Sequence, residues 1–326
     1  MIVFKIFIMI YLCLRTKLIL LCGNHLIKML AKLKKNIFIL SIFLNIALTG
    51  ERFNLRNLDN SYFYILISPD KSKMILSNTS YNTLTFLTNK EVFFSNIPTL
   101  NAFNCKWSPD SEKLLIMTSN YSKKKRLNGL YLLNKVGEVQ NTIIDNSIDR
   151  IFPLGWTGKN TIHYLINDTL RTFNIDKSKN EWDNELIYAI DKKVFIKEND
   201  LSSLLIYEAK NSVLNLDYSK NGRLIVFEVY GHNTVVLNRS NEKIISIGKA
   251  NGPVISPDDS KILFMDLSDD GYQFTSGDIF LWDLKSETII PILNDPEIIE
   301  MNPVWLDNGS FYYIDYKTGS VKFKKL

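Results

Sequence analysis

The sequence predicts an all-β protein, a single β-propeller behind an N-terminal apolar leader. Three observations lead to this fold class. A Ser-Pro-Asp turn recurs along the chain at a constant offset from an apolar strand. The turns follow one another at about the length of one propeller blade. Apolar, β-branched and aromatic residues form short runs after residue 50, without the period of an amphipathic helix.

Residues 1–50 have the composition of a targeting segment. They carry seven basic side chains and no acidic one. Lys32, Lys34 and Lys35 precede the apolar run Ile37–Leu48, whose length of about a dozen residues is below the roughly 20 residues of a membrane-spanning helix. A positive segment, a short apolar core and small residues after it are typical of a secretory signal peptide.

We therefore expect a signal peptide at residues 1–50, a propeller at residues 51–326, and a periplasmic or secreted location. Two alternatives concern the leader: translation that starts at Met29, and an uncleaved leader whose two apolar stretches anchor the protein in the membrane. In the second case the leader provides the only membrane contact. Cleavage near residue 50 would leave Cys105 as the one cysteine, so that no internal disulfide could form.

The charge of the predicted propeller argues against nucleic acid as a partner. The whole chain has 39 basic and 34 acidic residues. Without the seven basic residues of the leader, 32 basic residues remain against 34 acidic ones, a net charge of −2. Binding to nucleic acid needs a basic footprint for the phosphates, so we expect no nucleic-acid partner.

The Ser-Pro-Asp turn is the repeated unit of the sequence. It occurs as Ser68-Pro69-Asp70, Ser108-Pro109-Asp110 and Ser256-Pro257-Asp258, and in each case an apolar strand starts six residues after the Ser. Proline presets the backbone of the first central turn position, and the Asp side chain accepts hydrogen bonds from nearby backbone amides. Each copy therefore predicts a tight turn between two strands.

Three degenerate copies of the turn set the expected number of blades. They lie at Thr157–Asn160, Ser219–Gly222 and Leu306–Gly309, where Gly supplies the left-handed backbone. Successive turns are 40, 49, 62, 37 and 50 residues apart, and one blade takes about 40–50 residues. The sequence thus predicts six blades. Seven blades are the alternative, because the 62-residue interval also contains the strand-like runs Leu186–Tyr188 and Leu204–Tyr207.

Apolar runs between the turns predict further strands. They lie at Tyr62–Ser68, Lys113–Thr118, Gly129–Asn134, Val139–Ile144, Lys261–Asp266, Asp278–Asp283, Thr288–Leu293, Ser310–Asp315 and Ser320–Lys325. The last blade is short by this count, and an open ring would expose strand edges. We therefore expect Arg52–Leu58 to add the outer strand of the last blade and to close the ring.

Trp107-Ser108-Pro109-Asp110, Ser256-Pro257-Asp258 and the Asp278–Asp283 strand carry a resemblance to a known family. The pattern resembles the WD40-like PD40 repeat of TolB-like proteins over about residues 54–326. The resemblance implies a propeller that binds partners of the cell envelope. It covers neither the α/β domain that precedes the propeller of TolB nor the hydrolase domain of propeller peptidases, and we expect neither here.

The predicted propeller offers few residues for catalysis. Its two histidines are His163, within an expected strand, and His232, within an expected turn. No nucleophile elbow, zinc motif or phosphate-binding glycine loop is present. Carboxylates cluster between Asp266 and Asp278, which could suit calcium, but their spacing does not match a calcium-binding loop and a solvated hairpin tip explains them. We therefore predict no catalytic residue, no metal and no cofactor.

One charge run stands out in the body, Tyr121–Arg126, with four consecutive basic side chains. It lies between two expected strands, and the prediction is a solvated loop. The alternative is a contact point for an anionic polymer or an acidic partner.

These observations favour a non-catalytic, exported binding module that engages a protein, peptide or glycan of the cell envelope, and we expect a monomer. Loops and a central channel give a propeller its binding surfaces, although the sequence does not assign individual binding residues. The alternative is an enzyme, a polysaccharide lyase or hydrolase, with its site at the channel mouth. Acidic residues or histidines converging on the channel would favour the enzyme, whereas a mixed channel with aromatic residues would favour binding.

Overall fold

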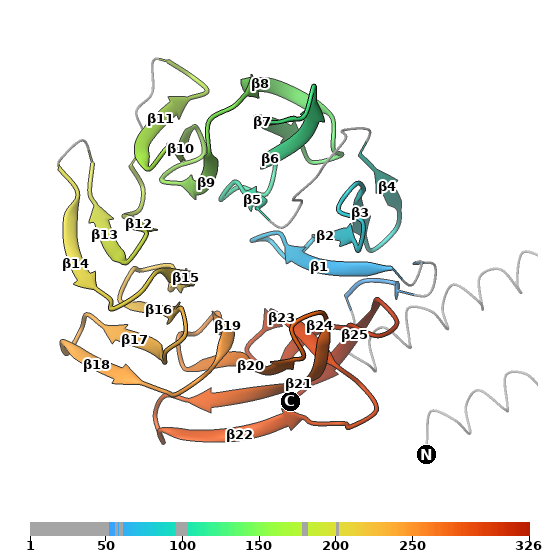
Figure 1. Cartoon of the computed structure of the whole chain (residues 1–326), viewed down its shortest axis with the longest axis vertical. Helices are drawn as coiled ribbons and strands as arrows, with labels where there is room; N and C mark the ends of the chain where they lie inside the picture. Colours follow the sequence, from blue (N-terminus) through green and yellow to red (C-terminus); the bar gives the residue numbers. More distant parts are fainter. Residues whose placement is uncertain (1–51, 56–57, 59–60, 96–103, 178–181, 200–201) are drawn as a thin grey trace, which may run out of the picture. The chain divides into compact units, whose positions relative to one another are not determined.

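The protein is a seven-bladed β-propeller. A computed structural model describes residues 52–326, except 56–57, 59–60, 96–103, 178–181 and 200–201. The 25 strands of this part form seven antiparallel sheets around a central channel (Figure 1). The predictions about the leader, its cleavage and a start at Met29 lie outside the described residues.

The blades follow one another in sequence order, each a three- or four-stranded meander. Blade 1 contains β1 (Tyr62–Ile67), β2 (Lys73–Asn78), β3 (Leu84–Thr88) and β4 (Val92–Phe94), and blade 2 contains β5 (Lys106–Trp107), β6 (Lys113–Ser122), β7 (Lys125–Asn134) and β8 (Val139–Ser147). Blade 3 contains β9 (Ile151–Trp156), β10 (Thr161–Ile166) and β11 (Thr169–Asn174), and blade 4 contains β12 (Leu186–Ile190), β13 (Lys193–Lys197) and β14 (Leu204–Glu208). Blade 5 contains β15 (Val213–Tyr218), β16 (Leu224–Val229), β17 (Thr234–Asn238) and β18 (Lys243–Ser246). Blade 6 contains β19 (Asn251–Ile255), β20 (Lys261–Asp269), β21 (Phe274–Asp283) and β22 (Thr288–Leu293), and blade 7 contains β23 (Glu300–Asp307), β24 (Ser310–Asp315) and β25 (Ser320–Lys325).

The blade count corrects the expectation of six in favour of the alternative of seven. The 62-residue interval holds a complete extra sheet, β12–β14, between blades 3 and 5. The last residue pair between β12 and β13 is Ile190 with Lys193, so only Asp191 and Lys192 form the turn. This two-residue turn needs no Ser-Pro-Asp motif, and the turn count therefore missed the blade.

Burial is greatest in the second strands of the blades and is lower in the strands that border the channel and at the rim. In most blades the neighbouring blades cover the second strand on both faces, so it is a continuous buried run; all six residues of β16 and of β24 are buried. In blade 4, β13 instead alternates between buried and half-buried residues. Outer strands such as β8 and β22 are largely exposed. Apolar clusters pack between neighbouring blades, as between blades 1 and 2 and between blades 6 and 7, so each blade depends on the next.

The ring closes through side-chain packing and not through the expected outer strand. The described residues of Arg52–Leu58 form no strand. Phe53 is instead fully buried between blades 7 and 1, with its ring 5.8 Å from that of Tyr312. The Tyr62 amide donates to the Gly319 carbonyl at 2.9 Å. The segment therefore closes the ring as an apolar plug, and β25 is the edge strand of blade 7.

Two hairpins are longer than the sequence suggested. In blade 2, β6 extends to Ser122 and β7 begins at Lys125. In blade 6, β20 extends to Asp269 and β21 begins at Phe274. The basic run Tyr121–Arg126 is therefore the tip of a hairpin with two ten-residue strands and not a loop. In contrast, β22, β24 and β25 have the expected bounds.

Candidate functional site

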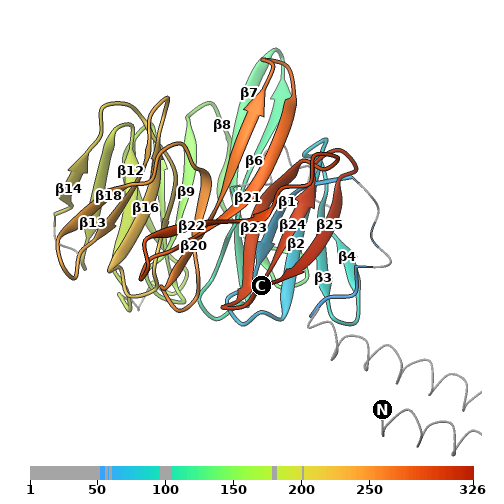
Figure 2. The ribbon, with the colours of Figure 1, turned by 90° about the horizontal axis from the view of Figure 1, so that it is seen from below.

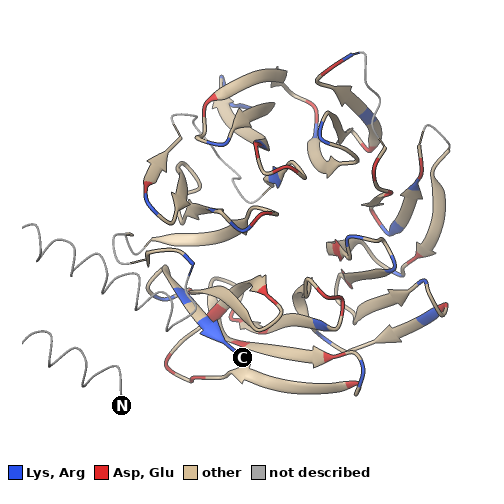
Figure 3. Cartoon of the chain, turned by 180° about the vertical axis from the view of Figure 1, so that it is seen from behind, with Lys and Arg blue, Asp and Glu red and all other residues tan. Residues whose placement is uncertain are grey.

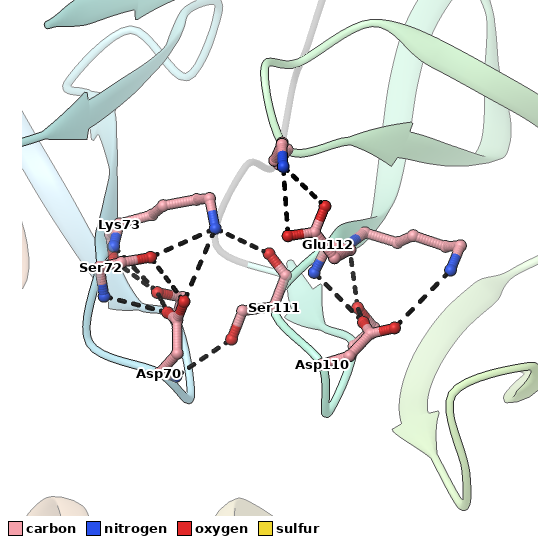
Figure 4. Close-up of polar contacts among 10 residues, drawn as sticks. Asp70, Ser72, Lys73, Asp110, Ser111 and Glu112 are labelled. Atoms are coloured by element: carbon pink, nitrogen blue, oxygen red, sulfur yellow. Dashed lines mark hydrogen bonds and ion pairs between the residues drawn. The ribbon is translucent and has the colours of Figure 1, made fainter.

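The connections between the first and second strands of the blades, here called the inner turns, surround one end of the channel. In blade 1, the Ser68 hydroxyl donates to Asp70 Oδ1 at 2.6 Å, and the Lys73 amide donates to Ser68 Oγ at 3.0 Å. The same two bonds join Ser108, Asp110 and Lys113 in blade 2. Figure 4 shows the turns of these two blades side by side, where the Asp70 amide also donates to Ser111 Oγ at 3.0 Å.

The degenerate turn of blade 5 keeps this geometry with different residues. Ser219 donates to Asn221 Oδ1 at 2.7 Å, so the Asn amide oxygen replaces the Asp carboxylate. The residue after the acceptor has a left-handed backbone in each turn, with φ of 63° at Lys71, 60° at Asp259 and 66° at Gly222. The Ser and Asp side chains thus serve the fold, whereas the left-handed Lys71 and Asp259 line the space beside the channel.

We expect Asp258→Ala to lower the free energy of unfolding by about 1 kcal/mol, the contribution of one turn hydrogen bond. Asp258 accepts from the Ser256 hydroxyl at 2.7 Å. Partial burial opposes ionisation, but the bonds from Ser256 and Ser260 keep the pKa of Asp258 below its ordinary value. Its contribution is therefore present at neutral pH and is lost as the pH falls through the lowered pKa.

Denaturant unfolding at neutral pH checks this expectation, with Asp258→Asn as the control. The Asn variant keeps the acceptor oxygen that blade 5 uses naturally at Asn221, and it should lose less stability than the Ala variant. Equal losses in the two variants would show that the hydrogen bond is not the cause.

Tryptophans just before the turns fasten neighbouring blades. The Trp305 indole N–H donates to the Val254 carbonyl of blade 6 at 3.0 Å, and the Trp156 indole N–H donates to the Lys106 carbonyl of blade 2 at 3.2 Å. Both tryptophans are almost fully buried. These bonds fix the innermost strands relative to one another and hold the channel wall in place.

A pocket of about 290 Å³ opens among the inner turns of blades 5, 6, 7 and 1. It lies at the ends of the strands that border the channel, β1, β15, β19 and β23 (Figure 1). Its lining mixes apolar residues (Ile67, Val254, Ile255, Pro257, Val304), aromatic residues (Tyr218, Trp305) and charged residues (Lys71, Asp217, Lys220, Asp259), together with Ser219 and Ser256. We call it the channel pocket.

The charges of the channel pocket are partly desolvated. Burial raises the pKa of Asp217, against the opposing effects of the Ile255 amide, which donates to Asp217 Oδ2 at 2.8 Å, and of Lys106. Burial lowers the pKa of Lys71, and Asp307 acts in the opposite direction. The side chain of Lys106 is exposed, and desolvation by the surrounding protein still lowers its pKa. The channel pocket therefore places carboxylates and lysines together where both are only partly solvated.

The histidines do not form a reactive pair. His163 is fully buried in blade 3, and the Thr157 and Thr172 hydroxyls lie 2.8 and 3.1 Å from its two ring nitrogens. Both nitrogens are therefore engaged within the blade. His232 lies exposed in the β16–β17 turn of blade 5. Cys105 is buried, and burial raises the pKa of its thiol to about 12, so it stays protonated at neutral pH.

The carboxylates considered for calcium lie on the β20–β21 hairpin. Asp266 and Asp278 pair directly across its two strands. Burial raises the pKa of Asp278, and Asp266 adds to the effect. Within the part of the chain that the structure describes, no three His, Cys, Asp or Glu side chains are placed to hold a metal ion.

Charge is mixed around the ring as a whole. Figure 3 shows Lys and Arg interspersed with Asp and Glu on all sides of the channel. Among the described residues, no helix has the length and apolar character needed to cross a membrane.

The ring of meander sheets and its inner turns define a WD40-like β-propeller. The chain is similar to the β-propeller domain of Cps50 (Swd1) from Myceliophteria thermophila, with 8% identity over 84% of this chain and 99% of that domain and a TM-score of 0.54. It is also similar to Hsv2 from Kluyveromyces lactis (10% identity, 82% and 98% covered, TM-score 0.52) and to the C-terminal WD40 domain of Sif2 (13% identity, 77% and 78% covered, TM-score 0.52).

At these identities the likeness concerns the fold alone. No protein-family model matches the sequence, and a search of curated proteins found no match. The TolB-like relationship therefore stays a prediction.

The residues of the channel pocket were not identified from the sequence. Lys71, Lys220 and Asp259 lie within or directly after the turn motifs, and Asp217 and Trp305 lie just before them. The available signal was the position of the turns: residues that flank the inner turns of neighbouring blades must meet around the channel.

Proposed function

We propose that the protein is a non-catalytic, exported binding module that engages a protein or peptide partner of the cell envelope through the channel pocket. The observation that supports this proposal is that lysines, carboxylates, aromatic rings and apolar side chains from four blades line the channel pocket. WD40-like propellers commonly serve as scaffolds for protein binding, which supports this choice over a glycan partner. The ring needs no second chain to complete it, so we propose that one monomer is the binding unit.

The size of the pocket suits an anchor of a larger partner. Its volume of about 290 Å³ lies at the lower end of ligand pockets, which span about 300–1,000 Å³. A protruding side chain or a chain terminus fits such a space and can contribute much of the binding energy when it is fully desolvated. The blades that carry the lining are fastened by Trp305 and by the inner turns, so little ordering is needed on binding.

An enzyme remains the second candidate because of Asp217. Asp217 is half-buried and its pKa is raised, as expected of a general acid, and Asp259 lines the same pocket. Both carboxylates, however, already accept hydrogen bonds that serve the fold. Asp217 accepts from the Ile255 amide, and Asp259 accepts from Asn221 Nδ2 at 3.0 Å. These hydrogen bonds give both carboxylates a structural role, so their presence in the pocket does not require a catalytic one.

We expect Lys220→Glu to weaken binding of the partner by about 10-fold, the effect of losing one favourable charge contact and gaining a repulsive one. Lys220 is an exposed lining residue of the channel pocket. Lys285→Glu is the matched control, because Lys285 is exposed in the β21–β22 turn away from the pocket and its replacement changes the net charge equally.

The measurement captures the partner on the wild-type protein from its native envelope and then compares the affinities of the three proteins by calorimetry. Equal affinities of the Lys220→Glu and Lys285→Glu variants would remove the channel pocket from the proposal.

We also propose that the leader is cleaved near residue 50, which places the propeller in the periplasm or the medium; an anchored, uncleaved leader is the alternative. The basis is the Lys-rich segment and the apolar run Ile37–Leu48. We expect N-terminal sequencing of the natural product to begin near residue 51. An intact residue 1–50 segment on a cytoplasmic protein would contradict export.

A further inference from the structure

Two hairpins stand out from the face of the disc opposite the inner turns. They are β6–β7 in blade 2 and β20–β21 in blade 6, with strands of nine or ten residues against six or fewer in the second and third strands of the other blades. Figure 2 shows both rising above the disc on the same side. Figure 1 places their blades on opposite sides of the channel.

The tip of β6–β7, here called the basic hairpin, is a rigid positive projection. Four basic side chains and no acidic one lie between Ser119 and Asn128. The strands stay paired up to Ser122 and Lys125, and Tyr121 is 70% exposed beside the tip. Among the described residues, no ion pair neutralises the lysines of the tip.

The turn of the basic hairpin has an unfavourable backbone conformation. Lys123 and Lys124 both have left-handed backbones, with φ of 48° and 64°. Such two-residue turns favour Asn-Gly, and a left-handed conformation costs other residues about 1 kcal/mol each.

The tip of β20–β21, here called the acidic hairpin, is the counterpart of opposite sign. Four carboxylates and no basic side chain lie between Asp266 and Asp278. The Tyr272 and Gln273 amides both donate to Asp270 Oδ1 at 2.9 Å and lower the pKa of Asp270, so this carboxylate is charged at neutral pH.

An aromatic pocket adjoins the acidic hairpin. Its volume is about 220 Å³, and its lining includes Asp269, Tyr272, Phe274 and Tyr316. Tyr272 is 99% exposed, and the rings of Phe274 and Tyr316 meet edge to face with centroids 5.4 Å apart. The pocket therefore offers apolar surface and negative charge together, which suits the aliphatic stem and ammonium of a lysine.

A partner for this face must carry both signs of charge at opposite positions. A uniformly anionic surface, such as a lipid membrane or a polyanion, would attract the basic hairpin but would be repelled by the acidic one. A second copy of the chain has the required pattern. Rotation about a two-fold axis that lies between the two faces brings the basic hairpin of each copy over the acidic hairpin of the other.

We propose that two copies of this protein associate face to face, with the basic hairpin of each seated in the aromatic pocket beside the acidic hairpin of the other. The inner-turn face and the channel pocket stay free, so each dimer presents two partner sites. The contact consists of two small charged patches, whereas a standard interface buries about 1,200–2,000 Å². The dimer is therefore weak and sensitive to salt, and the monomeric binding unit exists in equilibrium with it.

Sedimentation analysis of the protein, purified in the form its host accumulates, tests the association without any partner. We expect the wild type to dimerise in about 0.05 M salt and to dissociate in about 0.5 M salt, where charges are screened beyond about 4 Å. The variants Lys123→Glu/Lys124→Glu/Lys125→Glu and Asp266→Lys/Asp269→Lys/Asp270→Lys should each be monomeric. Their unchanged melting would show that they fold.

A mixture of the two variants gives the sharpest outcome. Each carries two hairpins of the same sign, and an equimolar mixture should regain a heterodimer. A wild type that stays monomeric at high concentration in low salt would overturn the proposal, as would variants that dimerise alone or a mixture that does not associate. Wild type that binds anionic vesicles as a monomer would instead assign the basic hairpin to a membrane and reject the dimer.

Discussion

Replacing Phe53 by Ala is expected to lower the free energy of unfolding by about 3–5 kcal/mol, as for other buried Phe→Ala changes. Phe53 has no exposed surface and packs in the cluster between blades 7 and 1. The Arg52 and Phe53 amides also donate to the Tyr312 hydroxyl at 3.1 and 3.3 Å. Deletion of residues 51–60 removes the whole plug and should be more damaging, because the two ends of the ring meet there without a covalent link.

Denaturant unfolding of the wild type and the variants measures this effect. Arg52→Ala is the control: the Arg52 side chain is exposed, and the backbone amide that donates to Tyr312 is kept. It should change the free energy of unfolding by less than about 0.5 kcal/mol. Unchanged stability of Phe53→Ala or of the deletion would show that the ring is closed elsewhere.

Gly319→Ala should destabilise the same junction by about 3 kcal/mol, the sum of a backbone strain and a steric conflict. Gly319 has a left-handed backbone with φ of 67°, and a Cβ atom would lie 2.8 Å from Ser61 Cα and 2.9 Å from the Tyr62 nitrogen. Both contacts are with backbone, so they cannot be relieved by a rotamer change. The conflict would also stretch the bond from the Tyr62 amide to the Gly319 carbonyl.

Gly271→Ala separates the two contributions. Gly271 also has a left-handed backbone, with φ of 87°, but a Cβ atom at this residue would meet no other atom within 4 Å. The variant should lose only about 1 kcal/mol, the cost of the left-handed conformation. Thermal unfolding of both variants provides the comparison. Equal losses would mean that the approach of blade 7 to β1 contributes nothing to closure.

The fold class followed from the sequence because turn chemistry is local. The interactions that form the first turn lie within the six residues from Ser68 to Lys73, and the same holds for the copies in blades 2 and 6. The starts of the strands that follow the turns were predicted to within one residue, whereas the far ends of β6 and β20 were placed too early. Blade 4 was missed for the same reason, since the turn at Asp191 and Lys192 is formed by strand pairing and carries no motif.

The channel pocket and the hairpin tips could not be predicted from local sequence patterns. Asp217, Lys71 and Trp305 come from three blades and are brought together by ring closure, which no local pattern encodes. The basic run Tyr121–Arg126 was visible as charge, but the pairing of Ser122 with Lys125 makes it a rigid hairpin tip. Its relation to the acidic hairpin depends on the angle between blades 2 and 6, which the corrected blade count changes.

Mass analysis of the captured partner tests the central claim, that the protein binds and does not convert its partner. The partner is incubated with the protein at about 100 copies per propeller, so that any turnover accumulates, and its intact mass is followed with time. We expect the mass to stay unchanged and the recovered complex to contain one partner per channel pocket. Product that exceeds one equivalent per propeller, and that disappears in the Asp217→Asn variant, would contradict the binding module and establish an enzyme.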